Sequence, residues 1–341
     1  MSKPQTIFRK QKAFSFLFLM PKTTAFPATT RDPLRKWYPA EDTDELATRI
    51  VGGHVITMAM VGICFNVFMF FHFLKKEKLS FYVLCTSKTV SNTMSLLIHL
   101  CYIGPVQLFY TAIGSMEFGA RLQQVFGGGL LLQGPMTQML ITVNRFLVIT
   151  FSPTTIPKYS THITVVALAV VWIMGIWWST LPGLPGHCFN PFFFDHVGYY
   201  ESRCNQELVV YQVGIIFPLA IFNNGMNVFL AIKLAISVYK KLSISSEVVR
   251  NRRKQTVRFF IQSCIQDWAT ATVLGTNIFL VSFFCEKHTC MILPSFAVDA
   301  TAYAVDGLVM FLFNYSRASK IIIKVESSNS VAVTSRASVA N

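Results

Sequence analysis

The sequence predicts an all-α membrane protein, a seven-transmembrane helix bundle with its amino terminus outside and its carboxyl terminus cytoplasmic. Three observations predict this fold. Of 341 residues, 52% are hydrophobic and only 13% are Asp, Glu, Lys or Arg, about half the charged share of a soluble domain. Seven stretches are apolar enough to cross a bilayer, which takes about 20 helical residues. Basic residues are also distributed unequally between the two sides.

The first and fifth predicted spans are the clearest, whereas the second, third and sixth carry polar residues. The spans are approximately Val51–Leu74, Phe81–Phe109, Gln124–Phe151, Ile163–Leu181, Leu208–Ile232, Val257–Phe284 and Met291–Phe313. Residues 51–315 therefore form the transmembrane domain. Residues 316–341 are predicted to form a short interfacial helix around Ile321–Ile323, followed by a disordered cytoplasmic tail rich in Ser and Thr.

Lys and Arg in the short connections predict the orientation, because cytoplasmic loops are enriched in them. With the amino terminus outside, sixteen fall on the cytoplasmic side and three, Arg121, Arg203 and Lys287, outside. The location of these charges, and not the net charge of +14 itself, predicts a lipid bilayer as partner and no nucleic acid. Residues 1–50 are interpreted as an extracellular or unprocessed leader. Within it, Ala13–Met20 could be the apolar part of a signal peptide; a disordered leader and a gene-model error are the alternatives.

A permanent cation, Arg145, lies near the inner end of the third predicted span, just before the break at Ser152-Pro153. As an isolated feature it would be a snorkelling anchor, whose long stem lies along the bilayer while its guanidinium reaches the headgroup phosphates. Within seven helices of this orientation, it resembles the arginine of G-protein-coupled receptors. Asn144-Arg145-Phe146 is similar to their Asp-Arg-Tyr triplet, but it lacks the acid, so any restraint on Arg145 must come from elsewhere.

Further residues carry the resemblance. Gly62 and Asn66, Pro218, and Asn314-Tyr315-Ser316 are similar to receptor motifs. The chain departs from the common pattern, with no Asp in the second span, no Cys at the top of the third and no Pro beside Asp267-Trp268 in the sixth. With Phe81 to Asn92 and Phe313 to Arg317, these features resemble nematode serpentine receptor class x (Srx), over residues 50–320. The resemblance implies a rhodopsin-like chemoreceptor of sensory neurons that signals through a heterotrimeric G protein.

Polar residues recur at helical spacing within three predicted spans, and they should face the bundle interior. Counted at 1.5 Å per residue from the cytoplasmic ends, Lys88, Asp267 and Asp306 share a layer about 10 to 14 Å deep with Asn66 of the first span. We expect a buried polar network of Asn66, Lys88, Asn92, Asp267 and Asp306. Lys88 needs a counter-ion, and Asp306 and Asp267 are both at a suitable depth. The network is equally suited to a structural clamp and to a switch.

A second polar layer is expected nearer the outside. The candidate ligand-pocket residues are His99, Tyr102, Asn277, Asp299 and Tyr303. Helix packing is the simpler interpretation of Asp299. At the inner face, the basic connection with Arg252 and Arg253 either anchors headgroups or docks a G protein together with Asn144, Arg145, Asn314 and Tyr315.

Four of the eight cysteines, Cys188, Cys204, Cys285 and Cys290, lie in predicted outer connections. The outside is oxidising, so disulfides are expected there. Three pairings are formally possible, and we favour the local pairs Cys188–Cys204 and Cys285–Cys290. The remaining cysteines lie in predicted spans, where a small buried thiol is ordinary.

No catalytic residue, cofactor or metal site is predicted, because the histidines are scattered and no His-Glu-x-x-His motif or phosphate loop is present. The predicted function is therefore a receptor that binds a small environmental chemical or pheromone and activates a heterotrimeric G protein. A ligand-gated channel or secondary transporter is the alternative, since buried charges can line an ion path. The expected location is the plasma membrane of a sensory-neuron cilium, and the Ser/Thr-rich tail suits a receptor kinase and arrestin.

Overall fold

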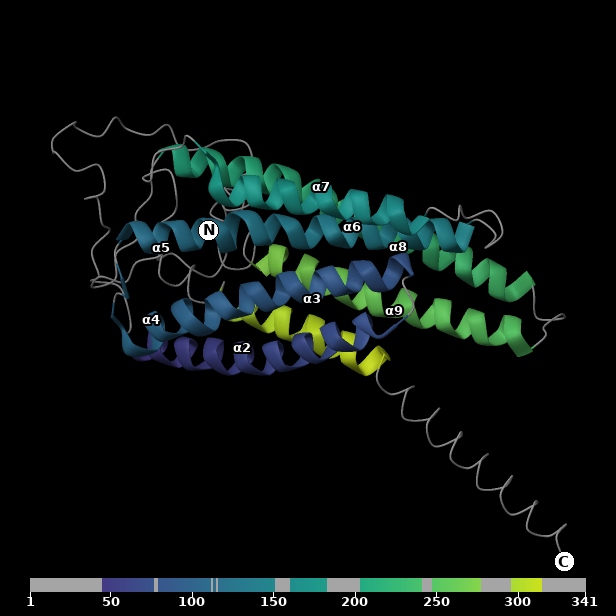
Figure 1. Cartoon of the computed structure of the whole chain (residues 1–341), viewed down its shortest axis with the longest axis horizontal. Helices are drawn as coiled ribbons and strands as arrows, with labels where there is room; N and C mark the ends of the chain where they lie inside the picture. The colour runs from purple at the N-terminus through teal and green to yellow at the C-terminus, as the bar shows by residue number, and fades with distance from the viewer. Residues whose placement is uncertain are drawn as a thin grey trace, which may run out of the picture.

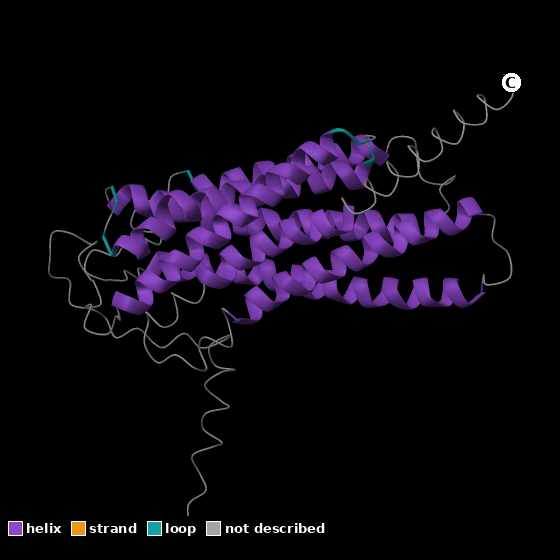
Figure 2. Ribbon diagram, turned by 90° about the horizontal axis from the view of Figure 1, so that it is seen from below, coloured by secondary structure: helices purple, strands orange, loops and turns teal. Residues whose placement is uncertain are grey.

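The computed structural model describes residues 45–76, 79–111, 113–114, 116–150, 160–182, 203–240, 247–276 and 296–314. These residues are almost entirely helical and contain no strand. The long helices run side by side along one axis (Figures 1 and 2). Each of the seven predicted spans contains helix, which confirms the predicted fold class.

π-Helical segments lie within the second predicted span and at the start of the third. The helices are α2 (Glu45–Leu74), α3 (Ser80–Ile98), α4 (Gly104–Phe109), α5 (Met116–Gln123), α6 (Leu131–Thr150), α7 (Ser160–Thr180), α8 (Arg203–Lys240), α9 (Glu247–Gly275) and a last helix, Phe296–Asn314. Segment η2 (His99–Ile103) joins α3 to α4, and η3 (Gln124–Leu130) joins α5 to α6. The second span is therefore α3–η2–α4, and the third continues from α5 through η3 into α6.

Several helices extend beyond the apolar stretches that predicted them. Helix α2 begins at Glu45, inside the predicted leader, where Glu45 forms a 2.6 Å ion pair with Arg49. Helices α8 and α9 reach Lys240 and Glu247 at the predicted cytoplasmic end. Hydropathy marks only the part of a helix that lies in lipid, whereas Glu, Lys, Arg and Gln continue a helix readily into water.

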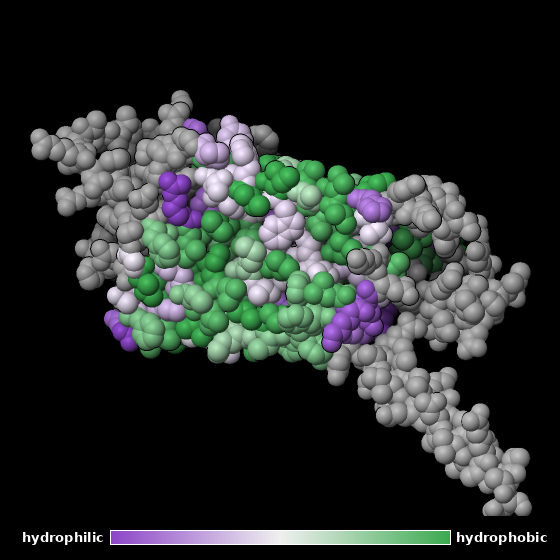
Figure 3. Space-filling view, in the orientation of Figure 1, coloured by the Kyte–Doolittle hydropathy of each residue, from purple (hydrophilic) through white to green (hydrophobic). Residues whose placement is uncertain are grey.

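Four described helices are long and apolar enough to cross a membrane by composition alone, namely α2, α7, α8 and the last helix. The second, third and sixth spans fall short because buried polar residues lower their mean hydropathy. The surface, by contrast, is largely apolar. Figure 3 shows one face of the molecule, where a broad apolar belt lies between hydrophilic patches near the two ends of the bundle. The belt indicates the surface that meets lipid.

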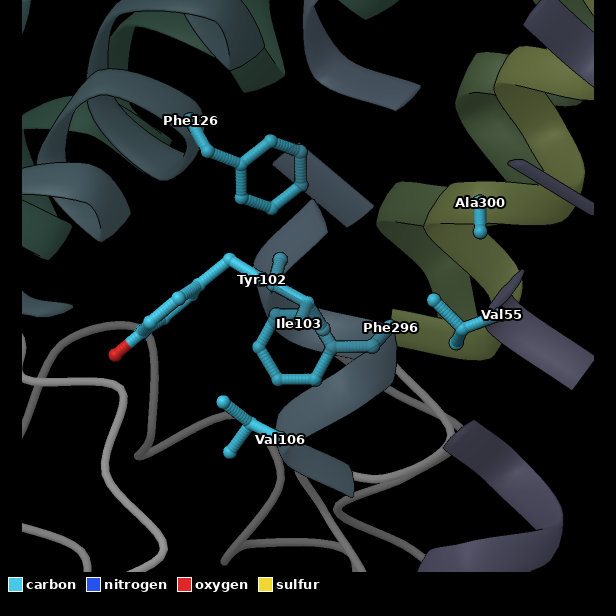
Figure 4. Close-up of a cluster of buried hydrophobic side chains, with 7 residues drawn as sticks. All are labelled: Val55, Tyr102, Ile103, Val106, Phe126, Phe296 and Ala300. Carbon is cyan, nitrogen blue, oxygen red and sulfur yellow. The ribbon is translucent and has the colours of Figure 1, made fainter. Parts of the chain in front are cut away.

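Two apolar clusters are separated by polar residues along the bundle axis. The outer cluster, drawn in Figure 4, joins α2, η2, α4, η3 and the last helix through Val55, Tyr102, Ile103, Val106, Phe126, Phe296 and Ala300. The inner cluster consists of Met69, Phe73, Phe81, Leu84, Cys85, Ile141 and Met310. Along α3 and its continuation η2, Lys88 comes between residues of the inner and the outer cluster, and Asp306 does so along the last helix. The polar layer is thus enclosed by apolar packing on both sides.

Candidate functional site

A buried ion pair occupies the centre of the bundle. Lys88 Nζ of α3 lies 3.0 Å from Asp306 Oδ1 of the last helix, and both side chains are more than nine-tenths buried. Lys88 also donates a 2.6 Å hydrogen bond to Gln138 Oε1 of α6. A buried charge is tolerated only when its partner and further hydrogen bonds replace the lost water. The pair therefore ties three helices to one another.

Two asparagines complete the carboxylate side of this pair. Asn92 Nδ2 donates to Asp306 Oδ2 at 2.6 Å and lies 3.2 Å from Asn66 Oδ1. Asn66 in turn donates to the backbone oxygens of Gly62 at 2.8 Å and Tyr303 at 3.3 Å. A Cβ at Gly307 would lie 2.5 Å from Asn66 Nδ2, so glycine is required for this close approach. Residues of α2, α3 and the last helix are joined here.

Asp267 occupies a second arm of the same network. Its Oδ2 accepts a 2.6 Å hydrogen bond from Asn227 Nδ2 of α8 and lies 3.5 Å from Ser263 Oγ. Gln138 Nε2 donates to Ser263 Oγ at 2.8 Å, which connects this arm to Lys88. Of the two acids at suitable depth, Asp306 forms the direct ion pair with Lys88, and Asp267 is linked to Lys88 through Gln138.

A cavity of about 60 Å³ lies against the ion pair. Its polar lining consists of Lys88, Asn92, Gln266, Thr270, Asp299, Tyr303 and Asp306, and the apolar remainder includes Leu131, Pro135, Ile216 and Val273. The amide nitrogen of Gln266 is buried and has no hydrogen-bond partner among the described residues. The depth of Asp299 and Asp306 along the chain predicts that they lie in different layers. They line one cavity, because they and Tyr303 share one face of the last helix.

Two predicted pocket residues lie outside this cavity. His99 is fully buried, its Nδ1 is 2.9 Å from the Ser95 carbonyl oxygen, and its ring meets Phe126 edge-on at 4.6 Å. Tyr102 belongs to the outer apolar cluster, and Figure 4 shows its hydroxyl directed away from the other labelled side chains. Both residues pack against aromatic rings instead. Asn277 lies outside the described residues.

Arg145 is buried at the inner end of the bundle and is only 5% exposed. Its Nη1 donates a 3.3 Å hydrogen bond to the Phe260 carbonyl oxygen of α9. Its guanidinium lies 5.4 Å from the centre of the Phe81 ring, which stacks on Phe259 at 4.3 Å. Nε and Nη2 have no hydrogen-bond partner within the described part of the chain. In place of the missing acid, a backbone carbonyl and an aromatic face hold Arg145.

The other inner-face residues are described only in part. Asn144 is half-buried, and Asn314 Nδ2 lies 3.2 Å from Gln262 Oε1 of α9. Arg252 and Arg253 lie in α9, but their side chains are outside the described set, as is Tyr315. The predicted disulfide cysteines also fall outside it: Cys204 has only its backbone described, in α8, and Cys188, Cys285 and Cys290 have none. Cys64, Cys85, Cys101 and Cys264 are free thiols.

Sequence reasoning missed several members of the network, above all Gln138, Ser263 and Asn227. Gln138, Thr142 and Arg145 are all buried on α6, and their spacing of four and three residues places them on one helix face. The same polar periodicity that identified Lys88 could have identified Gln138. No sequence signal marks the Phe260 carbonyl, because every residue type carries the same backbone acceptor.

The family of this chain follows from comparison with known proteins. The model of the serpentine type seven-transmembrane GPCR chemoreceptor family Srx matches residues 56–314. The chain belongs to the Srx family. The resemblance seen in its motifs is thereby confirmed, and this Srx chain is a chemoreceptor-family member and a multi-pass protein of the plasma membrane. No curated protein sequence matches it significantly.

A solved structure supports the fold independently. The crystal structure of squid rhodopsin matches this Srx chain with a TM-score of 0.61 at 13% identity, and covers 85% of this chain and 88% of the rhodopsin chain. At that identity the match shows a shared seven-helix fold. Within the described residues of the Srx chain, no three His, Cys, Asp or Glu residues are grouped as metal ligands.

Proposed function

We propose that this receptor binds a small environmental chemical or pheromone in its central cavity and activates a heterotrimeric G protein at its inner face. It acts in the plasma membrane of a sensory-neuron cilium. Its Ser/Thr-rich tail is the substrate of a receptor kinase, and the phosphorylated tail binds arrestin.

One observation carries this proposal: the cavity is lined by both members of the buried ion pair, Lys88 and Asp306, together with Asp299 and Tyr303. A ligand in the cavity would touch the atoms that hold α3, α6 and the last helix in their present arrangement. A ligand shifts a conformational equilibrium only through contacts that differ between the two states. The ion pair supplies such a contact.

The inner face is connected to this layer through α6. Gln138, which accepts from Lys88, lies seven residues before Arg145 on the same helix face. Arg145 is held by Phe260 of α9 and Phe81 of α3. Displacement of α3 or α9 relative to α6 would therefore release Arg145 for a partner. Asn144, Arg252, Arg253, Asn314 and Tyr315 are the further coupling residues of the proposal.

The experiment begins with a calcium screen of volatile and soluble chemicals in cells that express the receptor. An agonist found in this way is then applied to Arg145→Ala and to Ala269→Phe, which fills the cavity. Both variants should reach the surface and lose most of the G-protein response. Arg49→Ala, an exposed outer cation, and Val228→Phe, on the lipid face of α8, are the matched controls.

Two results would contradict the proposal. A full response from Arg145→Ala at normal surface expression would mean that Arg145 only anchors the helix. A voltage-clamp current that persists when G proteins are blocked would identify the protein as a channel.

A further inference from the structure

A groove of about 440 Å³ lies between α2, α3 and α7, on a different side of α3 from the central cavity. Its apolar walls come from Phe73, Leu74, Val83, Val90, Leu168 and Trp172. The polar groups along it are Lys76, Tyr82, Thr86 and Ser87. Trp172 is fixed in place, because its Nε1 donates a 2.8 Å hydrogen bond to Ser87 Oγ. This hydrogen bond joins α7 to α3 along the groove.

The groove runs from the membrane surface towards the bilayer centre. Lys76 follows the end of α2, and Val90 lies ten residues beyond Ser80, the first residue of α3. Ten helical residues span about 15 Å, which is half of a hydrocarbon core of about 30 Å. The groove is thus as long as one leaflet is thick, and the basic residues place it in the cytoplasmic leaflet.

The charge of the groove is confined to its mouth. Lys75 and Lys76 are exposed there, and among the residues that the structure describes no acidic side chain lines the groove. Towards the opposite end the lining is apolar and aromatic, with Val90, Leu168 and Trp172. A ligand that fits must carry a negative group at one end and a hydrocarbon chain along the rest. Basic pockets between helices on the cytoplasmic side suit anionic lipid headgroups.

We propose that this groove is a binding site for one anionic phospholipid of the inner leaflet. Its phosphate pairs with Lys76, and one acyl chain runs past Tyr82 and Val83 to Trp172. The site does not depend on the ligand or G protein proposed above. Because the Tyr82 ring also meets Phe259 of α9 edge-on at 6.1 Å, the bound chain contacts a residue that packs at the inner end of the bundle.

The test is native mass spectrometry of the purified full-length receptor in mild detergent, titrated separately with phosphatidylserine, phosphatidylcholine and cholesterol. Wild type should retain one phosphatidylserine at concentrations where phosphatidylcholine is lost. Lys76→Gln should weaken phosphatidylserine binding about five-fold and leave phosphatidylcholine unchanged. Val83→Trp fills the groove and should abolish binding of the single retained phosphatidylserine. Val90→Phe fills the deeper end and should have the same effect, so that the test stands if Val83→Trp does not fold.

Lys233→Gln is the control for unspecific attraction, since Lys233 is a cytoplasmic-end cation of α8 that does not line the groove. The proposal is overturned if wild type retains the two phospholipids equally, or if Lys233→Gln weakens binding as much as Lys76→Gln. It is also overturned if cholesterol, and not phosphatidylserine, is the lipid that the filling variants expel.

Discussion

Lys88 Nζ and Asp306 Oδ1 are 3.0 Å apart in the middle of the bundle, and each has a further side-chain partner, Gln138 and Asn92 respectively. Removal of one member of a buried pair typically costs about 3 to 5 kcal/mol because it leaves the other charge stranded. Lys88→Met or Asp306→Asn alone should therefore lower thermal stability and surface delivery. The double variant should recover part of the loss, as measured by a double-mutant cycle.

The control for that cycle is Lys88→Met combined with Asp267→Asn. Asp267 lies with Asn227 and Ser263, so this second pair should show little rescue. Equal rescue by both acids would contradict a specific Lys88–Asp306 pair.

The ring of Phe81 should restrain the resting receptor. Phe81→Leu removes the aromatic face beneath Arg145 and the stack on Phe259. A loss of about 1 kcal/mol, within the usual range of a cation–π contact, shifts a two-state balance about five-fold. Basal nucleotide exchange on a co-reconstituted G protein should rise by that factor. Phe71→Leu, on the lipid face of α2, should leave it unchanged, and an unaltered basal rate in Phe81→Leu would exclude the restraint.

Gly307 is required by the position of Asn66. A methyl group at this site would lie 2.5 Å from Asn66 Nδ2, so Gly307→Ala should displace the asparagine from Asn92 and the Tyr303 carbonyl. We expect a loss of about 1 to 3 kcal/mol, visible as a lower melting temperature. Gly225→Ala of α8 meets nothing within 4 Å, and should be neutral or stabilising by up to ~1 kcal/mol. Similar melting temperatures for the two variants would show that the packing at Asn66 relaxes freely.

The outer disulfides are a prediction from the sequence, because their cysteines lie outside the described side chains. Mass spectrometry of unreduced peptides should link Cys188 to Cys204 and Cys285 to Cys290. A link between the two outer connections would disprove the pairing, and free thiols at all four positions would disprove the disulfides themselves.

The sequence alone predicted seven membrane-spanning segments, although buried polar residues leave only four of them apolar enough to be recognised by composition alone. It also indicated that Lys88, Asp267 and Asp306 share a depth, since a helix rises by a constant 1.5 Å per residue. Depth states how far a residue lies along the bundle axis and leaves its position around that axis open. Only the packing of the helices decided that Asp306 pairs with Lys88, whereas Asp267 is reached through Gln138. Tertiary structure also decided which group takes the place of the missing acid beside Arg145. Every residue has a backbone oxygen, and only the approach of α6 to α9 selects that of Phe260.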